Sequence, residues 1–173
     1  FAREEILAVL NRGLPERLRI PPGNVWFPDP ATPAAYDRRI EEAGGVDLFI
    51  LASGASDGHV AFNPSGTPLA SGSRIVELAE ATRRDNLGTF PDFRSLEEVP
   101  RHGVTVGLGT IARLSREVLR IVTASHKQLA VERLATSHDF DPAWPATVIF
   151  RCRAPRVFLD AAAVPPLLRK DLP

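Results

Sequence analysis

The sequence contains no methionine, one cysteine and no long apolar run. A lone cysteine, Cys152, excludes an internal disulfide framework and fits a protein of the reducing cytoplasm. No uninterrupted apolar stretch approaches the roughly 18 residues that cross a bilayer, and the mixed charges of residues 3–5 are not those of a signal peptide. We therefore expect a cytoplasmic protein outside the membrane. Because the chain starts at Phe1 and lacks methionine, we also expect that further residues precede it in the native protein.

The sequence also lacks an excess of either positive or negative charge. Lys and Arg together number 21, as do Asp and Glu, so no global field attracts nucleic acid or an anionic membrane. Histidine and cysteine never cluster in the sequence, so a metal site is not expected. What is present, 173 residues of which 44% are hydrophobic and 24% charged, suits a single globular domain over residues 1–173 with a sizeable core.

Apolar periodicity alternates between helical and strand patterns along the chain. Such alternation predicts an α/β fold with a largely parallel sheet. The segment 74–78 fits either a strand or a helix, and the tail 165–173 is expected to be loosely held. Helices are predicted over 2–12, 33–43 and 79–86, in a short segment ending at Arg116, and from Ser125 to Ala135; strands are predicted over 25–27, 46–51, 104–106, 118–123, 147–150 and 157–159.

The almost unbroken apolar run Val46–Leu51 is the feature that organises the rest, and its pattern is that of a strand buried on both faces. A strand at 25–27 and a helix ending at Gly44 would complete a βαβ unit with a right-handed crossover. Small and polar residues follow the run and place an acid two positions before an imidazole, at Asp57 and His59. Ligands bind at the carboxyl ends of strands in an open α/β sheet, so this pair is a candidate site.

His59 is the first candidate for chemistry. Imidazole titrates near neutral pH, and a neighbouring carboxylate such as Asp57 can orient the ring and favour its protonated form. On its own, a histidine beside a glycine is more often a surface residue, and Asp57-Gly58 is also an ordinary turn dipeptide. The position directly after a buried strand is what favours a catalytic pair.

Lys127 is the second candidate. Ser125 and Gln128 form a capping-box pattern, which predicts that a helix starts here after a strand. The free N–H groups and positive dipole end of such a helix suit a phosphate, as does a lysine in its first turn. A solvated surface lysine is the alternative. His126 is expected at the surface.

Weaker candidates have simpler structural explanations. Gly107 and Gly109 could turn around a phosphate, but tight packing of a strand against a helix explains them equally well. Cys152 is expected to be a small packing residue in a strand rather than a nucleophile. Trp26 and Trp144 are expected to anchor the core. The basic side chains expected to form a solvated, salt-bridged face are Arg74, Arg83 and Arg84.

Four blocks of sequence carry a further signal when they are taken together. They are Asp47–Leu51 leading into Asp57–Asn63, Arg74–Leu78 with Thr82, Arg83 and Asn86, Val104–Ile111, and Ser125–Lys127 followed by Ala130. In this order and at this spacing they resemble the glucosamine-6-phosphate deaminase/isomerase family, over a span from about Ile20 to Ala162. The pair Phe62-Asn63 favours this family over the related 6-phosphogluconolactonases, which share only the Asp-Gly-His core.

The resemblance implies a three-layer, Rossmann-like α/β fold with a mostly parallel sheet. It implies an enzyme that converts glucosamine 6-phosphate to fructose 6-phosphate and ammonia by ring opening and aldose–ketose isomerisation. By the same resemblance His59 opens the sugar ring with help from Asp57, Gly54 and Gly58 contact the substrate, and Lys127 binds its phosphate. The resemblance implies no redox cofactor and no catalytic metal. The expected partner is a small-molecule sugar phosphate, and a homo-oligomer is left open.

The chain departs from the family pattern at several positions. Pro64 stands where the family has a glutamate that tunes the histidine. Ser53 and Ala55 replace glycines, which narrows the approach of the backbone to the sugar, and Gly88 replaces a phosphate-binding arginine. The family's Ser/Gly-rich phosphate loop and its proton-abstracting aspartate would lie upstream of Phe1.

These departures leave two alternatives to the deaminase. One is a diverged, non-catalytic protein that binds a sugar phosphate. The other keeps the scaffold and changes the chemistry to hydrolysis of a lactone.

Overall fold

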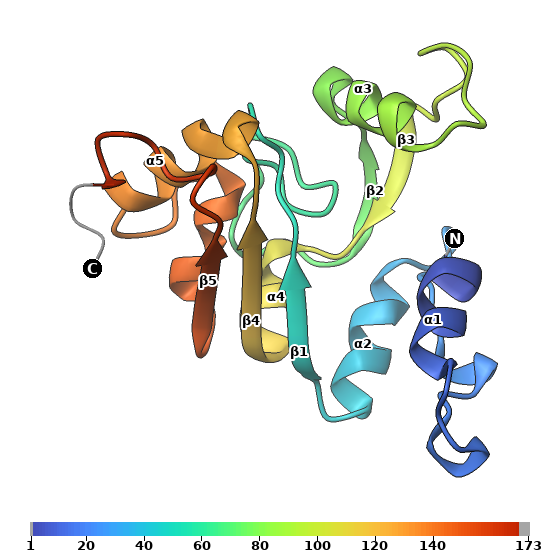
Figure 1. Ribbon diagram of the computed structural model, residues 1–173. Coiled ribbons are helices and arrows are strands. Elements are labelled where there is room, and N and C mark those ends of the chain that lie inside the picture. Colours follow the sequence, from blue (N-terminus) through green and yellow to red (C-terminus); the bar gives the residue numbers. More distant parts are fainter. Residues whose placement is uncertain (1, 170–173) are drawn as a thin grey trace.

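A three-stranded parallel sheet forms the centre of the protein, and the computed structural model describes residues 2–169 (Figure 1). Strand β4 (Ser115–Val122) lies in the middle, between β1 (Val46–Leu51) and β5 (Pro155–Leu159). Register pairs Phe49 with Val118 and Leu51 with Arg120. The prediction of an α/β fold with a mostly parallel main sheet is therefore confirmed.

The segment 74–78, for which the sequence fits either a strand or a helix, contributes a strand to a second, smaller sheet. Strand β2 (Arg74–Glu77) pairs antiparallel with β3 (His102–Thr105), and helix α3 (Glu80–Thr89) lies between them in the chain. The remaining helical elements are the π-helical turn Ala2–Leu7 continuing into α1 (Ala8–Asn11), the 3₁₀ turns Glu16–Leu18, Pro22–Asn24 and Ser125–Lys127, the 3₁₀ segment Pro145–Arg151, and the helices α2 (Ala34–Glu42), α4 (Leu108–Leu114) and α5 (Gln128–Thr136).

The core lies on the face of the main sheet that α4 covers (Figure 1). Alternate side chains of a strand point to opposite faces, so Leu51 and Val118 meet Leu108 and Ile111 of α4 there. Trp144, predicted to anchor the core, is buried in the same cluster. The single-domain organisation stays a prediction.

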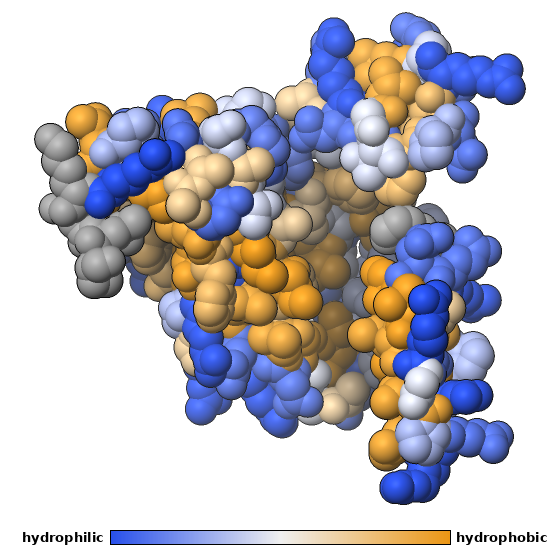
Figure 2. Space-filling view, in the orientation of Figure 1, coloured by the Kyte–Doolittle hydropathy of each residue, from blue (hydrophilic) through white to orange (hydrophobic). Residues whose placement is uncertain are grey.

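The prediction that β1 is buried on both faces is wrong for the residues described here. Leu48 is 49% exposed and Ile50 is 64% exposed, and both point away from α4. Ile121 of β4 and Phe158 of β5 extend the same apolar surface, at 54% and 56% exposure, over the strands (Figure 2). Parallel sheets are normally covered on both faces, which is why the apolar run was interpreted that way.

Two predicted strands do not form. Residues 25–27 are not a strand, so the predicted βαβ unit is absent; Trp26 instead lies against α2, with the Arg39 guanidinium 3.9 Å from its ring centroid. Residues 147–150 belong to the 3₁₀ segment that follows Trp144, with Pro145 at its start. A short, fully buried apolar run fits a helix or a strand equally well, and proline is favoured in a first helical turn.

The predicted capping box at Ser125 is also wrong. No side chain caps either the 3₁₀ turn or α5. The chain enters through Ala124 at φ 71°, and the Asp160 carboxylate accepts the N–H of Ala124 at 3.0 Å. Within α5, Ala130 and Leu134 are buried as predicted. The two other side chains predicted to face the core, Leu129 and Ala135, are exposed.

The tail is held more firmly than predicted as far as it is described. Leu168 packs against Val122 and Val131, and Arg169 Nε donates a hydrogen bond to the carbonyl of Val164 at 3.0 Å. The predicted tail beyond residue 169 lies outside the described residues. Over residues 2–169, no helix combines the length and the apolar character needed to span a bilayer.

Candidate functional site

The loop 52–60 leaves the carboxyl end of β1 and turns back on itself. The N–H of Gly54 donates to the carbonyl of His59 at 2.9 Å, which closes the loop at its base. A Cβ on Gly54 would overlap with Asp57 Oδ1 and His59 Nδ1, and a Cβ on Gly58, at φ 64°, would overlap with the Trp144 ring. Both glycines are therefore required by the close approach of the backbone to its neighbours.

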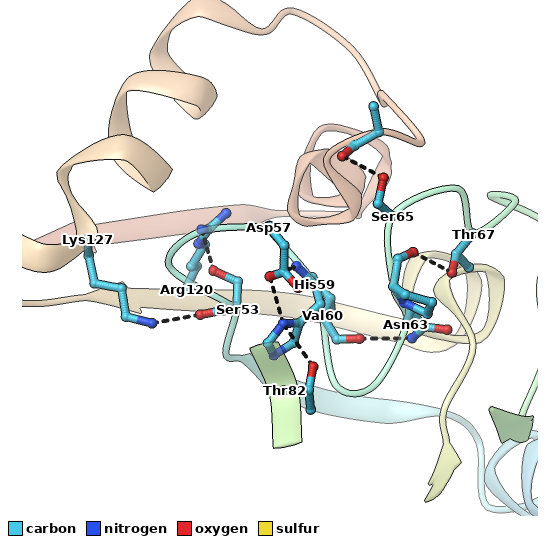
Figure 3. A network of polar contacts seen from close by, with 12 residues as sticks. Ser53, Asp57, His59, Val60, Asn63, Ser65, Thr67, Thr82, Arg120 and Lys127 are labelled. Carbon is cyan, nitrogen blue, oxygen red and sulfur yellow. Dashed lines mark hydrogen bonds and ion pairs between the residues drawn. The ribbon is translucent and has the colours of Figure 1, made fainter. Parts of the chain in front are cut away.

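The structure brings Asp57 and His59 together as a hydrogen-bonded pair (Figure 3). Asp57 Oδ1 lies 2.8 Å from His59 Nδ1 and 3.2 Å from the His59 backbone nitrogen. An ionised carboxylate only accepts hydrogen bonds, so Nδ1 carries the proton and Nε2 is left as the acceptor. Thr82 Oγ1 of α3 lies 3.3 Å from the same Nδ1. The ring is 12% exposed, so it is held firmly but can still be reached.

Asn63 follows the loop 52–60 in the chain and binds to residues of the smaller sheet and its flanks. Its side chain is fully buried, and Nδ2 donates to the carbonyls of Val60 at 3.0 Å and Val106 at 2.7 Å. Its Oδ1 accepts from Arg74 Nη1 at 2.8 Å. A buried amide satisfied on both sides fixes the position of the chain that follows His59.

Replacing Asn63 with alanine should lower the free energy of unfolding by about 3 kcal/mol, because buried acceptors and the Arg74 guanidinium lose their partner. Urea unfolding of the complete protein measures this loss. Ser65→Ala, two positions after Asn63, removes one exposed hydrogen bond to the carbonyl of Ala143 in a distant segment and should change the free energy of unfolding by less than about 0.5 kcal/mol. Equal losses in the two variants would contradict the anchoring role of Asn63.

Lys127 reaches the same loop from the far side of β4. Its Nζ donates to the carbonyl of Ser53 at 2.9 Å, which places the ammonium group at the carboxyl end of β1 (Figure 3). It precedes α5 in a 3₁₀ turn rather than lying in the first turn of a capped helix. Arg120 Nη2 donates to the hydroxyl of the same Ser53 at 2.5 Å.

The other predicted basic candidates behave differently from one another. Arg84 forms an exposed pair with Glu80, as predicted for a solvated face. The prediction is wrong for Arg74, which binds Asn63, and for Arg83, which donates to the carbonyl of Val99 at 3.1 Å. Burial lowers the pKa of Arg74. These two side chains hold loops in place.

Three further sequence candidates have structural explanations. A Cβ on Gly107 would overlap with the backbone of Ser71, so close packing accounts for this glycine. Cys152 is buried as predicted, but it follows the 3₁₀ segment instead of lying in a strand, and burial raises its pKa to about 11. A thiol of that pKa is a poor nucleophile at neutral pH. His126 is exposed, as predicted.

A cleft of about 510 Å³ opens between β2 and the start of α3, and Pro64, Arg74 and Glu80 are among its lining residues. Another cleft, of about 560 Å³, lies against α4. Neither lining includes Asp57, His59 or Lys127. Across residues 2–169, no three His, Cys, Asp or Glu side chains are grouped to hold a metal ion.

Sequence reasoning missed two residues of this site. Thr82 was noted only as part of a motif, and nothing in the sequence indicates that α3 folds over His59. Arg120 left a signal that went unused, since it is the single charged residue in the otherwise apolar run 118–122 of β4. A charge in the middle of a buried strand is rare unless it has a partner or a function.

Comparison with known proteins finds similar sequences that are named glucosamine-6-phosphate deaminase, although no family model matches the chain. It is 41% identical over 161 residues to the glucosamine-6-phosphate deaminase of Mycolicibacterium smegmatis, covering 90% of this chain and 60% of that protein. It is 36% identical over 174 residues to the glucosamine-6-phosphate deaminase of Beutenbergia cavernae, covering 97% and 65%. The chain thus spans less than two thirds of the length of these relatives.

Solved structures agree with the sequence relatives. A monomeric glucosamine-6-phosphate deaminase superposes with a TM-score of 0.76 at 26% identity, over 90% of this chain and 64% of that one. A 6-phosphogluconolactonase from Thermotoga maritima gives a TM-score of 0.52 at 24% identity, over 87% and 62%, which concerns the fold alone. The predicted Rossmann-like α/β fold class is confirmed by these likenesses.

Proposed function

This chain belongs to the glucosamine-6-phosphate deaminase family, and on that premise we propose that the complete protein converts glucosamine 6-phosphate to fructose 6-phosphate and ammonia. The observation that carries the proposal is the Asp57–His59 pair, placed with Lys127 around one loop at the carboxyl ends of the strands. An imidazole and an ammonium group at such a sheet edge match the two ends of a phosphorylated sugar.

His59 supplies the proton transfer that opens the sugar ring. With Nδ1–H held by Asp57, its Nε2 can take the proton of the anomeric hydroxyl as the bond between C1 and the ring oxygen breaks. The same imidazole then returns a proton to that ring oxygen, which leaves the open-chain aldehyde. Lys127 binds the phosphate at the other end of the substrate, where its charge fixes the sugar relative to the imidazole.

The experiment that tests the proposal is an assay of the complete protein for ammonia and fructose 6-phosphate released from glucosamine 6-phosphate. Formation of both products in equal amounts is the expected result. Absence of turnover with every hexosamine phosphate and hexose phosphate would rule the proposal out.

A sugar-phosphate-binding protein without catalysis is the second candidate, and Pro64 and Gly88 favour it. Pro64, which stands where the family has a carboxylate, lines the cleft between β2 and α3, and Gly88 in α3 leaves open space where the family has an arginine. In that case glucosamine 6-phosphate raises the melting temperature while no product forms. The predicted alternative of lactone hydrolysis has only the shared fold in its favour.

The cellular setting of this activity is a proposal as well. We place the enzyme in the cytoplasm, with a soluble sugar phosphate as its partner and no nucleic acid or membrane. The even balance of charge supports the last two points.

A further inference from the structure

Arg120 is the largest side chain that the described part of the protein buries completely. It lies in the central strand β4, and no carboxylate among residues 2–169 forms an ion pair with it. Its Nε has no hydrogen-bond partner. Burial lowers the pKa of Arg120 to about 10, which still leaves the guanidinium charged at pH 7. A buried cation without a counter-charge opposes folding, which makes Arg120 a candidate for a functional role.

The contacts of this guanidinium all lead to the loop that carries the Asp57–His59 pair. Nη2 donates to the hydroxyl of Ser53 at 2.5 Å, at the start of the loop. Nη1 lies 3.4 Å from the carbonyl of Ala146, whose own N–H donates to the carbonyl of Gly58 at 2.8 Å, at the end of the loop. One buried side chain therefore supports both ends of the loop 53–58.

Ser53 also links this cation to a second one. Its hydroxyl accepts from Arg120, while its carbonyl accepts from Lys127 Nζ at 2.9 Å (Figure 3). Two positive groups thus converge on a single residue from different sides. The ammonium group has three N–H donors, so two remain for a ligand after the contact with Ser53.

We propose that Arg120 is a positioning residue for a phosphate group bound at Lys127. Through Ser53 it fixes the carbonyl that orients the ammonium group, and the bound anion supplies a counter-charge that no carboxylate among residues 2–169 provides. The inference rests on the proposed function only in taking Lys127 as the phosphate ligand. It assigns no contact between Arg120 and the reacting atoms of the sugar.

A purely structural role for Arg120 makes a different prediction. If the side chain only fills space, methionine of similar volume alters stability but leaves phosphate affinity unchanged. A positioning role predicts weaker phosphate binding. Stability does not separate the two roles, because Arg120→Met removes a buried charge but also leaves the acceptors of Ser53 and Ala146 without their donor.

The test measures the dissociation constant of inorganic phosphate by calorimetry, and kcat and KM for glucosamine 6-phosphate, in the complete protein. Arg120→Met should raise the dissociation constant of inorganic phosphate by about tenfold, the effect of losing a charged hydrogen bond. It should also raise KM more than it lowers kcat. Arg120→Lys keeps the charge and should recover part of the loss. The matched control is Arg116→Met, an exposed arginine of the same strand paired with Asp47, which should bind phosphate as the parent does.

The outcomes separate this inference from the proposed function. Wild-type phosphate affinity in Arg120→Met overturns the inference, even if ammonia release continues. Arg120-dependent phosphate binding without any ammonia release supports the inference and contradicts the deaminase. If Arg120→Met fails to fold, Ser53→Ala decides, since it removes the hydroxyl acceptor and keeps both charges. Phosphate affinity unchanged in Ser53→Ala would then overturn the inference, as would a parent protein that binds no phosphate.

Discussion

Replacing His59 with alanine should lower kcat for ammonia release by about 10²–10⁴-fold, the range that a positioned acid–base group contributes. The reason is geometric. Asp57 holds Nδ1 at 2.8 Å and Thr82 lies beside it, so Nε2 is the nitrogen left to move the proton between the anomeric hydroxyl and the ring oxygen. The ring is only 12% exposed, and a small cavity filled by water would replace it. Steady-state assays of the complete protein measure the loss.

A second variant separates catalysis from folding in this prediction. His102→Ala removes an exposed imidazole from β3 and should leave kcat and the melting temperature at the parent values. Asp57→Asn should lower kcat less than His59→Ala does, because the ring stays in place while its tautomer is no longer fixed. Undiminished ammonia release by His59→Ala would exclude the proposed role of the imidazole.

The positions of the central strands along the chain could be predicted because each is a short apolar run with a clear end. Val46–Leu51 and the strands near 118 and 157 were placed correctly on this basis, and Asp57 and His59 follow the first of them as expected. The pairing between β2 and β3 was not predictable, because their interaction spans a long segment of loop and helix. Hydrophobic pattern alone does not specify the partner of a strand.

The errors have physical causes of the same kind. Residues 25–27 have the residue types of a strand but pair with no strand in the described part of the chain, and the Arg39 guanidinium packs on Trp26 instead. Serine is a residue type that commonly caps a helix, yet Ser125 caps none. Instead the carboxylate of Asp160, far along the chain, accepts a hydrogen bond from the backbone N–H of Ala124. In both cases a distant contact replaced the local preference that the sequence pattern expressed.

The candidate site also combines features visible in the local sequence with features that depend on distant contacts. Its candidate chemical groups could be proposed from local sequence, since Asp57, His59 and Lys127 each follow a strand. The supporting contacts of Asn63 and Thr82 could not, because they join separate segments, whereas the charge of Arg120 in an apolar run is visible in the sequence itself. Fixing a catalytic group in place depends on such supporting contacts as much as on the group itself.

Gly54→Ala should cost more activity than any other single methyl group added to the loop. The new Cβ would overlap with both Asp57 Oδ1 and His59 Nδ1, so the hydrogen-bonded pair has to shift. A displacement of about 1 Å at a catalytic group can lower the rate about 100-fold, and forcing an extra methyl group into a packed site costs about 1–3 kcal/mol of stability. Kinetics and urea unfolding of the complete protein measure the two effects.

Two other glycines make the result specific to the catalytic pair. Gly58→Ala meets the Trp144 ring at a positive φ, so it should lower stability without directly displacing the contact between Asp57 and His59. Gly23→Ala has open space and should change neither quantity. Activity should therefore fall furthest in Gly54→Ala even where its stability loss equals that of Gly58→Ala. Parent-level kcat/KM in a folded Gly54→Ala protein would mean that the pair does not need its observed position, and the ring-opening role of His59 would lose its geometric basis.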